Sequence, residues 1–159
     1  MKYSLLATVA AATLAGFAAA PAAAQTPTGM MGDLRPDQQD FRGLYQELVE
    51  TNTTVTNGSC TQAAEQLATR LKAAGMDASN LTVFTTPEHP KDGGLVAIYP
   101  GTDAAMEPML LLGHIDVVEA KREDWVRDPF KLIEENGYFY ARGVADDKAM
   151  SAIWADTLI

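Results

Sequence analysis

The sequence predicts an α/β layer fold, in which helices pack against short β-strands. Two helical patterns come first, and three short β-type runs follow, separated by segments rich in Pro and Gly. The third run, Met109 to Leu112, is uniformly apolar, as a strand buried on both faces of a sheet would be. A chain of 159 residues leaves room for one domain.

Helix periodicity and capping residues predict the first two helices. Ordered structure is expected from Asp37, and a second helix from Ser59, which can form a capping box with Gln62, to Gly75. The first helix has apolar residues at spacing i, i+3, i+4 and i+7: Phe41, Leu44, Tyr45 and Leu48.

The remaining elements follow from short local signals. Asn136-Gly137, between the runs 131–134 and 138–141, predicts a tight β-hairpin. A last helical pattern follows Gly143 and continues to Leu158. The other two β-type runs are Leu81 to Phe84 and Leu95 to Tyr99.

Composition excludes several classes of function. Hydrophobic residues make up 47% of the chain, which argues against disorder. The net charge is −9 and no cluster of Lys and Arg offsets it, so nucleic acids and anionic membrane surfaces are not expected partners.

The N-terminus has the three-part layout of a secretory signal peptide. Lys2 precedes an uncharged run that ends at Ala20, and Ala22-Ala23-Ala24 forms a small-residue cleavage site. We therefore expect a signal peptide at 1–24, a flexible linker at 25–36 and a periplasmic or secreted protein that is free of the membrane after processing. An N-terminal anchor helix is the alternative.

Cys60 and His89 are potentially reactive residues, but neither is expected to be catalytic. Cys60 is the only cysteine, so no disulfide forms within the chain, and it lies beside a predicted helix cap with no nearby His to activate it as a nucleophile. His89 lies between Glu88 and Pro90 in a polar turn and is expected on the surface.

Two clusters contain residue types that bind metals. His114 and Asp116 follow the apolar run 109–112, and their i, i+2 spacing would put them on one face of a strand. A carboxylate beside a neutral His can orient the ring as a zinc ligand. The alternative is a strand that simply ends in solvent.

The second cluster precedes the last helix. Asp146 and Asp147 lie in a loop near the positive end of this helix, where a carboxylate could bridge two divalent cations. The alternative is an ordinary helix N-cap.

The two clusters and the residues between them resemble the dinuclear-zinc metallopeptidase and deacylase family, which includes aminoacylase, carboxypeptidase G, acetylornithine deacetylase and succinyl-diaminopimelate desuccinylase. The resemblance spans about 40 residues with order and spacing intact. Ala141 and Ala149 stand where the family commonly has Gly. The matching residues are Gly113-His114-Ile115-Asp116-Val117-Val118, Trp125, Asp128-Pro129-Phe130, Asn136-Gly137 and Arg142-Gly143-Val144-Ala145-Asp146-Asp147-Lys148.

The resemblance implies a three-layer zinc-peptidase-like domain with a central mixed sheet, of which residues 37–159 would be the N-terminal part. It further implies that His114 is a zinc ligand, that Asp116 orients His114 and assists catalysis, and that Asp146 bridges two zinc ions, which cobalt or manganese could replace. A cis peptide bond between Asp146 and Asp147 is also implied.

The expected function is zinc-dependent hydrolysis of peptide or N-acyl amino-acid amide bonds. The family's Glu-Glu pair, further ligands and dimerisation domain have no counterpart after Asp146, so this chain alone is expected to be inactive. A homodimer would form through that missing domain. A non-catalytic secreted binding module that retains half of a metal site is the alternative function.

Overall fold

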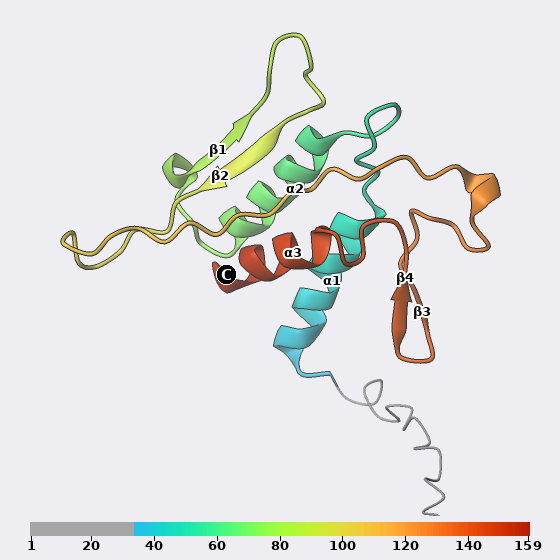
Figure 1. Ribbon diagram of the computed structural model, residues 1–159. Coiled ribbons are helices and arrows are strands. Elements are labelled where there is room, and N and C mark those ends of the chain that lie inside the picture. Colours follow the sequence, from blue (N-terminus) through green and yellow to red (C-terminus); the bar gives the residue numbers. More distant parts are fainter. Residues whose placement is uncertain (1–33) are drawn as a thin grey trace, which may run out of the picture.

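The computed structural model describes residues 34–159 (Figure 1). The predicted signal peptide at 1–24 and most of the linker at 25–36 lie outside the described residues. Within the described part, the first helix begins at Pro36, one residue before the expected start at Asp37. Proline suits this position, because the first turn of a helix has no partner for its N–H group.

The described residues form three α-helices. They are α1 (Pro36–Glu50), α2 (Cys60–Ala73) and α3 (Lys148–Thr157). The hydroxyl of Ser59 caps α2 as predicted by accepting a hydrogen bond from the Gln62 N–H group at 3.1 Å. The predicted capping box is incomplete, because the Ser59 N–H group donates to the Asn52 carbonyl at 2.8 Å and not to the Gln62 side chain. Gly75 follows α2 with a φ of 103°, a conformation that glycine adopts without strain. No helix in residues 34–159 is long and apolar enough to cross a membrane.

Two small antiparallel sheets accompany the helices. Strands β1 (Leu81–Phe84) and β2 (Gly94–Ala97) pair with Leu81 opposite Ala97. Strands β3 (Ile133–Glu135) and β4 (Tyr138–Tyr140) form the predicted hairpin around Asn136 and Gly137, whose φ values are 53° and 78°. The short 3₁₀ helices η1 (Ala78–Asn80) and η2 (Arg122–Asp124) complete the elements. The prediction of a mixed α/β chain is therefore confirmed.

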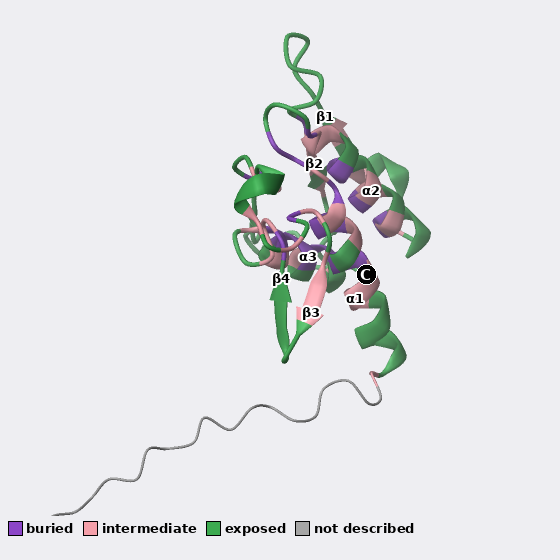
Figure 2. Ribbon diagram, turned by 90° about the vertical axis from the view of Figure 1, so that its right-hand side faces the viewer, coloured by how far each residue is buried: buried purple, intermediate pink, exposed green. Residues whose placement is uncertain are grey.

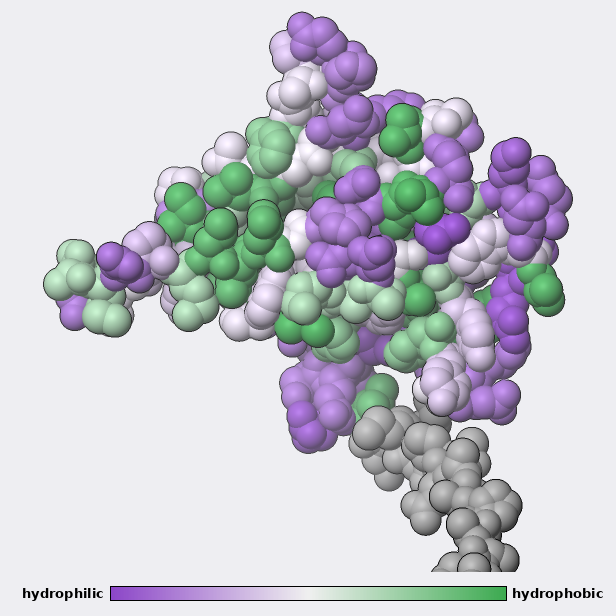
Figure 3. Space-filling model, viewed as in Figure 1, coloured by the Kyte–Doolittle hydropathy of each residue, from purple (hydrophilic) through white to green (hydrophobic). Residues whose placement is uncertain are grey.

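The predicted buried strand at Met109 to Leu112 is wrong in this structure. The segment runs as a coil between β2 and α3, and Met109, Leu110 and Leu112 are 85%, 82% and 77% exposed. A strand needs backbone partners on a neighbouring strand. Here side chains of α3 bind the backbone near Leu112 instead, and the two small sheets form no central sheet around it. Figure 3, viewed as in Figure 1, shows an apolar surface on the face of the molecule where this segment runs.

The hydrophobic core lies where the three helices meet (Figure 2). Helix α1 contacts both α2 and α3, and α2 also covers β1 and β2. The core positions of α1 confirm the helical periodicity of the sequence, since Leu44, Tyr45 and Leu48 are buried. The buried core also includes Val49, Ala63, Leu67, Ala141, Ala152 and Ala155.

Candidate functional site

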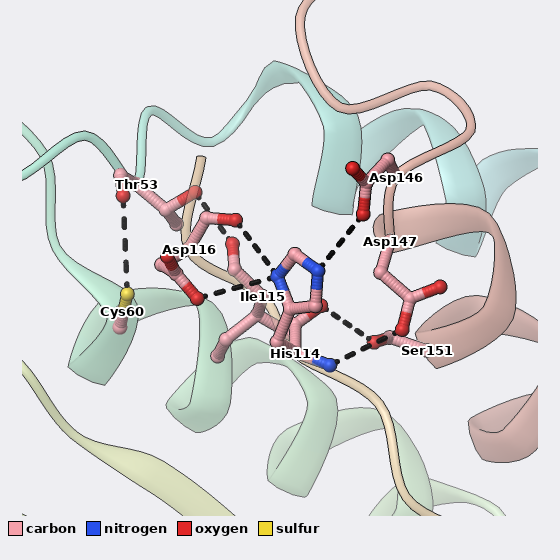
Figure 4. Close-up of polar contacts among 8 residues, drawn as sticks. All are labelled: Thr53, Cys60, His114, Ile115, Asp116, Asp146, Asp147 and Ser151. Carbon is pink, nitrogen blue, oxygen red and sulfur yellow. Dashed lines mark hydrogen bonds and ion pairs between the residues drawn. The ribbon is translucent and has the colours of Figure 1, made fainter. Parts of the chain in front are cut away.

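The three predicted site residues lie together, although two of them are 30 or more positions from the third in sequence (Figure 4). The His114 Nε2 atom is 2.9 Å from Asp146 Oδ1. On the other side of the ring, His114 Nδ1 is 3.2 Å from the Asp116 carbonyl oxygen and 3.3 Å from Asp116 Oδ1. The imidazole is thus held between the segment that follows residue 113 and the loop that precedes α3.

The charges around His114 favour a protonated ring. Partial burial lowers its pKa, but the hydrogen bond with Asp146 and the nearby Asp116 outweigh this effect and raise the pKa of His114 above its ordinary 6.5. The site is open to solvent, since the side chain of Asp146 is 91% exposed. A divalent cation would replace the proton between the imidazole and these carboxylates.

Asp147 does not act as a simple helix cap. It occupies the N-cap position of α3, but its side chain makes no capping hydrogen bond to that helix. Its Oδ2 atom instead accepts a hydrogen bond from the His114 N–H group at 3.3 Å. The helix-cap interpretation is therefore wrong for the Asp147 carboxylate. The Asp146–Asp147 peptide bond is cis, as the family resemblance implies.

Sequence reasoning missed three residues that bind the backbone around His114. Ser151 Oγ donates a hydrogen bond to the His114 carbonyl at 3.0 Å, and Trp154 Nε1 donates to the Leu112 carbonyl at 3.2 Å. Thr53 Oγ1 donates to the Ile115 carbonyl at 2.6 Å. Ser151 and Trp154 read as ordinary helix positions, and Thr53 lies 62 residues from Ile115, so no local signal could have identified these contacts.

Lys148 was also missed as a structural residue. Its side chain is fully buried, and Nζ donates a hydrogen bond to the Thr51 carbonyl at 2.7 Å. Burial lowers the pKa of Lys148 to about 8. The aliphatic part of the side chain lies against Gly143, where a Cβ atom would be 3.2 Å from Lys148 Cδ. Gly143 has a φ of 80°, so its lack of a side chain serves both the turn and this contact.

The motif residues between the two clusters contact one another. The guanidinium of Arg142 lies over the Trp125 ring at 5.0 Å, and the Arg142 N–H group donates to the Pro129 carbonyl at 2.7 Å. These contacts join the start of the loop before α3 to the segment that carries Trp125 and Pro129. These motif residues therefore pack against one another beside the cavity that Arg142 and His114 line.

Cys60 and His89 make no hydrogen bond to the three predicted site residues, although the Cys60 thiol lies 3.9 Å from the Thr53 carbonyl (Figure 4). Burial, followed by the nearby Asp116 and Asp92 carboxylates, raises the pKa of the Cys60 thiol above its usual 9.0 and makes it a weaker nucleophile. The His89 side chain is 71% exposed, with Nδ1 at 3.8 Å from Asp92 Oδ2. The expected surface position of His89 is confirmed.

The site lines a cavity of about 280 Å³ that extends from His114 and Asp116 to the loop 141–146. The donor types suit zinc, which binds imidazole nitrogen and carboxylate oxygen. Within residues 34–159, however, no group of three or more His, Cys, Asp and Glu side chains is arranged to hold a metal ion. His114 and Asp146 therefore fit part of a zinc site, and a complete site needs further ligands.

Comparison with known proteins finds a family similar to the C-terminal segment of this chain. The sequence model of peptidase family M20/M25/M40 matches residues 110–159. N-fatty-acyl-amino acid synthase/hydrolase PM20D1 of Mus musculus is 46% identical over 48 residues, which cover 30% of this chain and 10% of that protein. Aminoacylase-1 of Homo sapiens is 42% identical over 57 residues, which cover 35% of this chain and 14% of that protein.

The matched segment contains the whole candidate site and only a small share of each relative. His114, Asp116 and Asp146 all fall within residues 110–159. The segment spans between a tenth and a seventh of the curated relatives it matches. Residues 110–159 are thus similar to peptidase family M20/M25/M40, which supports the family resemblance of the motifs in this segment.

Proposed function

We propose that this protein is a metal-dependent hydrolase that cleaves the amide bond of N-acyl amino acids or peptides. One observation carries the proposal. Within residues 110–159, which match the family, His114 Nε2 lies 2.9 Å from Asp146 Oδ1, and Asp116 lies on the opposite side of the ring. Two of the matched relatives have names that describe N-fatty-acyl-amino acid hydrolysis and aminoacylase activity, which supports an N-acyl amino acid as the substrate.

In this proposal His114 and Asp146 bind zinc, which cobalt or manganese could replace. Asp116 holds His114 Nδ1, so that Nε2 stays directed toward Asp146. Asp146 would bridge the two ions, the role that the family resemblance implies, and its 91% exposed side chain leaves room for a second ion. When bound, zinc would act as a Lewis acid that polarises the scissile carbonyl.

The ligand count limits what this chain does alone. A catalytic zinc keeps about three protein ligands, whereas His114 and Asp146 supply two donors for the proposed pair of ions. We place the remaining ligands and the general base outside this sequence, and we expect the 159-residue chain to bind zinc weakly and to show no turnover. A three-layer domain with a central mixed sheet belongs to the same proposal, and the exposed apolar segment 109–112 supports it.

Export remains part of the proposal. The N-terminal signal pattern supports a periplasmic or secreted hydrolase, which favours a scavenging dipeptidase or aminoacylase over a biosynthetic enzyme. N-terminal sequencing of the exported protein tests the cleavage after Ala24. Recovery of an intact Met1-Lys2 terminus would favour the anchor helix instead.

Zinc titration calorimetry tests the metal site in the chain. We expect His114→Ala and Asp146→Ala each to raise the Kd for zinc at least about 10-fold, because each removes one donor. His89→Ala is the matched control, since it removes the other histidine and should leave the Kd unchanged. Equal zinc affinity in all four proteins would show that His114 and Asp146 do not form the metal site.

An assay on the product of the complete reading frame tests the hydrolase activity. We expect zinc-dependent release of amino acids from N-acyl amino acids or dipeptides, and loss of this release in His114→Ala and Asp146→Ala. Zinc binding without turnover, from a reading frame that stops after residue 159, would favour the non-catalytic binding module instead.

A further inference from the structure

We infer that Thr53 and Ser151 are positioning residues that set the place of His114 relative to Asp146. This inference rests on the proposed role of His114 as a metal ligand. Its basis is that two hydroxyl groups, from separate parts of the chain, bind the two consecutive backbone carbonyls at His114 and Ile115 (Figure 4).

The need for such residues follows from the coil structure around the site. A metal ligand on a strand is held by the hydrogen bonds of the sheet. The segment 109–116 has no strand neighbour among the described residues, so other groups must bind its backbone. The only hydrogen bonds to the backbone of Leu112 to Ile115 in the described part come from the side chains of Thr53, Asp147, Ser151 and Trp154.

Both hydroxyl groups are buried and their surroundings are tight. Thr53 is 1% and Ser151 is 8% exposed. A Cβ atom on Gly113 would lie only 2.7 Å from Ser151 Oγ, so the helix and the segment leave no room for a side chain between them. The Thr53 carbonyl also accepts a hydrogen bond from the Val117 N–H group at 3.3 Å, so Thr53 holds the segment at two points. Buried hydrogen bonds in such close contact fix a backbone position closely.

The two sides of the imidazole depend on these contacts in different ways. Ser151 belongs to α3, whose N-cap residue Asp147 directly follows Asp146, so it ties the His114 backbone to the element that carries the opposing carboxylate. Thr53 lies in the loop between α1 and α2 and fixes the backbone between His114 and Asp116. Together they hold the His114 imidazole between the Asp116 and Asp146 carboxylates.

The test uses the full chain with an isosteric substitution and its conservative partner. Thr53→Val keeps the side-chain shape and removes the hydroxyl group, whereas Thr53→Ser keeps the hydroxyl group. Ser151→Ala removes the second contact. Thr157→Val is the matched control, because the Thr157 hydroxyl also donates to a backbone carbonyl, that of Ile153 at 2.7 Å, but at the far end of α3.

Two measurements read out the position of His114. The first is the ¹⁵N NMR shift of the His114 ring in the metal-free protein, which reports the contact of Nε2 with Asp146. The second is the Kd for zinc by calorimetry. We expect Thr53→Val and Ser151→Ala to change the ring shift and to raise the Kd about 10-fold, the effect typical of residues that orient metal ligands. Thr53→Ser and Thr157→Val should resemble the wild type in both measurements.

The outcomes separate this inference from the proposed function. If His114→Ala binds zinc as tightly as the wild type, the proposed metal role of His114 is wrong, and the metal-free ring shifts still decide the positioning inference. If Thr53→Val and Ser151→Ala keep the wild-type ring shift, the positioning inference is overturned. It is also overturned if Thr53→Ser loses as much zinc affinity as Thr53→Val, since shape rather than the hydroxyl group would then control the site.

Discussion

The helix core and the segment that carries the candidate site are held in place by different forces. In the core, apolar side chains of α1, α2 and α3 pack together and are removed from water. Around Met109 to Asp116, large apolar side chains are exposed, and the backbone is held by hydrogen bonds from polar side chains. Apolar burial contributes most of the stability of a domain, whereas a single hydrogen bond contributes about 1 kcal/mol.

This difference separates stability from site geometry. A substitution in the helix core should lower the free energy of unfolding of the whole chain without moving His114 in the molecules that remain folded. A substitution that removes one polar contact to the segment should move the imidazole at a small cost in stability. Two α1 residues, Tyr45 and Glu50, also bind chain segments outside the helices, at Val144 and at 131–132.

The largest effect is expected from Leu48→Ala. Leu48 on α1 is 2% exposed, and the truncation should lower the free energy of unfolding by about 3 kcal/mol, because it removes buried methyl groups and leaves a cavity. Leu110→Ala is the control, since Leu110 is 82% exposed and its truncation should change the stability by less than about 0.5 kcal/mol. Urea denaturation followed by circular dichroism measures both. An equal loss in the two variants would mean that the segment 109–112 is buried in solution, and the comparison would fail.

A smaller effect is expected from Tyr45→Phe. Tyr45 is a core residue of α1, and its hydroxyl group donates a hydrogen bond to the Val144 carbonyl at 2.6 Å, in the loop that leads to Asp146. Removal of the hydroxyl group leaves that carbonyl without its partner, so we expect a loss of about 1 kcal/mol in the same urea experiment. Tyr138→Phe, at an exposed position of β4, is the control and should have no measurable effect. A Tyr45→Phe variant as stable as the wild type would show that the core does not hold this loop.

The same two regions show which parts of the structure the sequence could predict. The helices and the hairpin depend on local signals such as the apolar period of α1, the Ser59 cap and Asn136-Gly137, and all three predictions are confirmed. The run at 109–112 has the composition of a buried strand, but a strand also requires neighbours, and local composition cannot supply them. The motif predicts His114, Asp116 and Asp146 as site residues, and the structure brings these three together. The contacts of Thr53, Ser151 and Lys148 depend on residues that are far apart in sequence, so no local pattern predicts them.

The smallest effect is expected from Glu50→Gln and appears through its pH dependence. Glu50, the last residue of α1, accepts hydrogen bonds from the Leu132 N–H group at 3.1 Å and from Lys131 Nζ at 3.2 Å, and thereby joins the core helix to the segment before β3. Burial raises the pKa of Glu50, but the hydrogen bonds from Leu132, Lys131 and Gln46 outweigh it and lower the pKa below its usual 4.5.

A carboxyl group with a lowered pKa in the folded state stabilises the protein at pH values above its unfolded pKa. This contribution is lost as the pH falls through the folded pKa, because the protonated group no longer attracts Lys131. At pH 7 we therefore expect Glu50→Gln to be less stable than the wild type by about 0.5 kcal/mol, since the amide can still accept from Leu132 but no longer pairs with the charged Lys131, whose side chain is largely exposed. The difference should shrink as the pH falls below 4.5. Glu65→Gln, at an exposed position of α2, controls for the loss of one carboxylate. A stability difference that stays constant from about pH 7 to pH 3 would show that the Glu50 charge does not join α1 to the segment before β3.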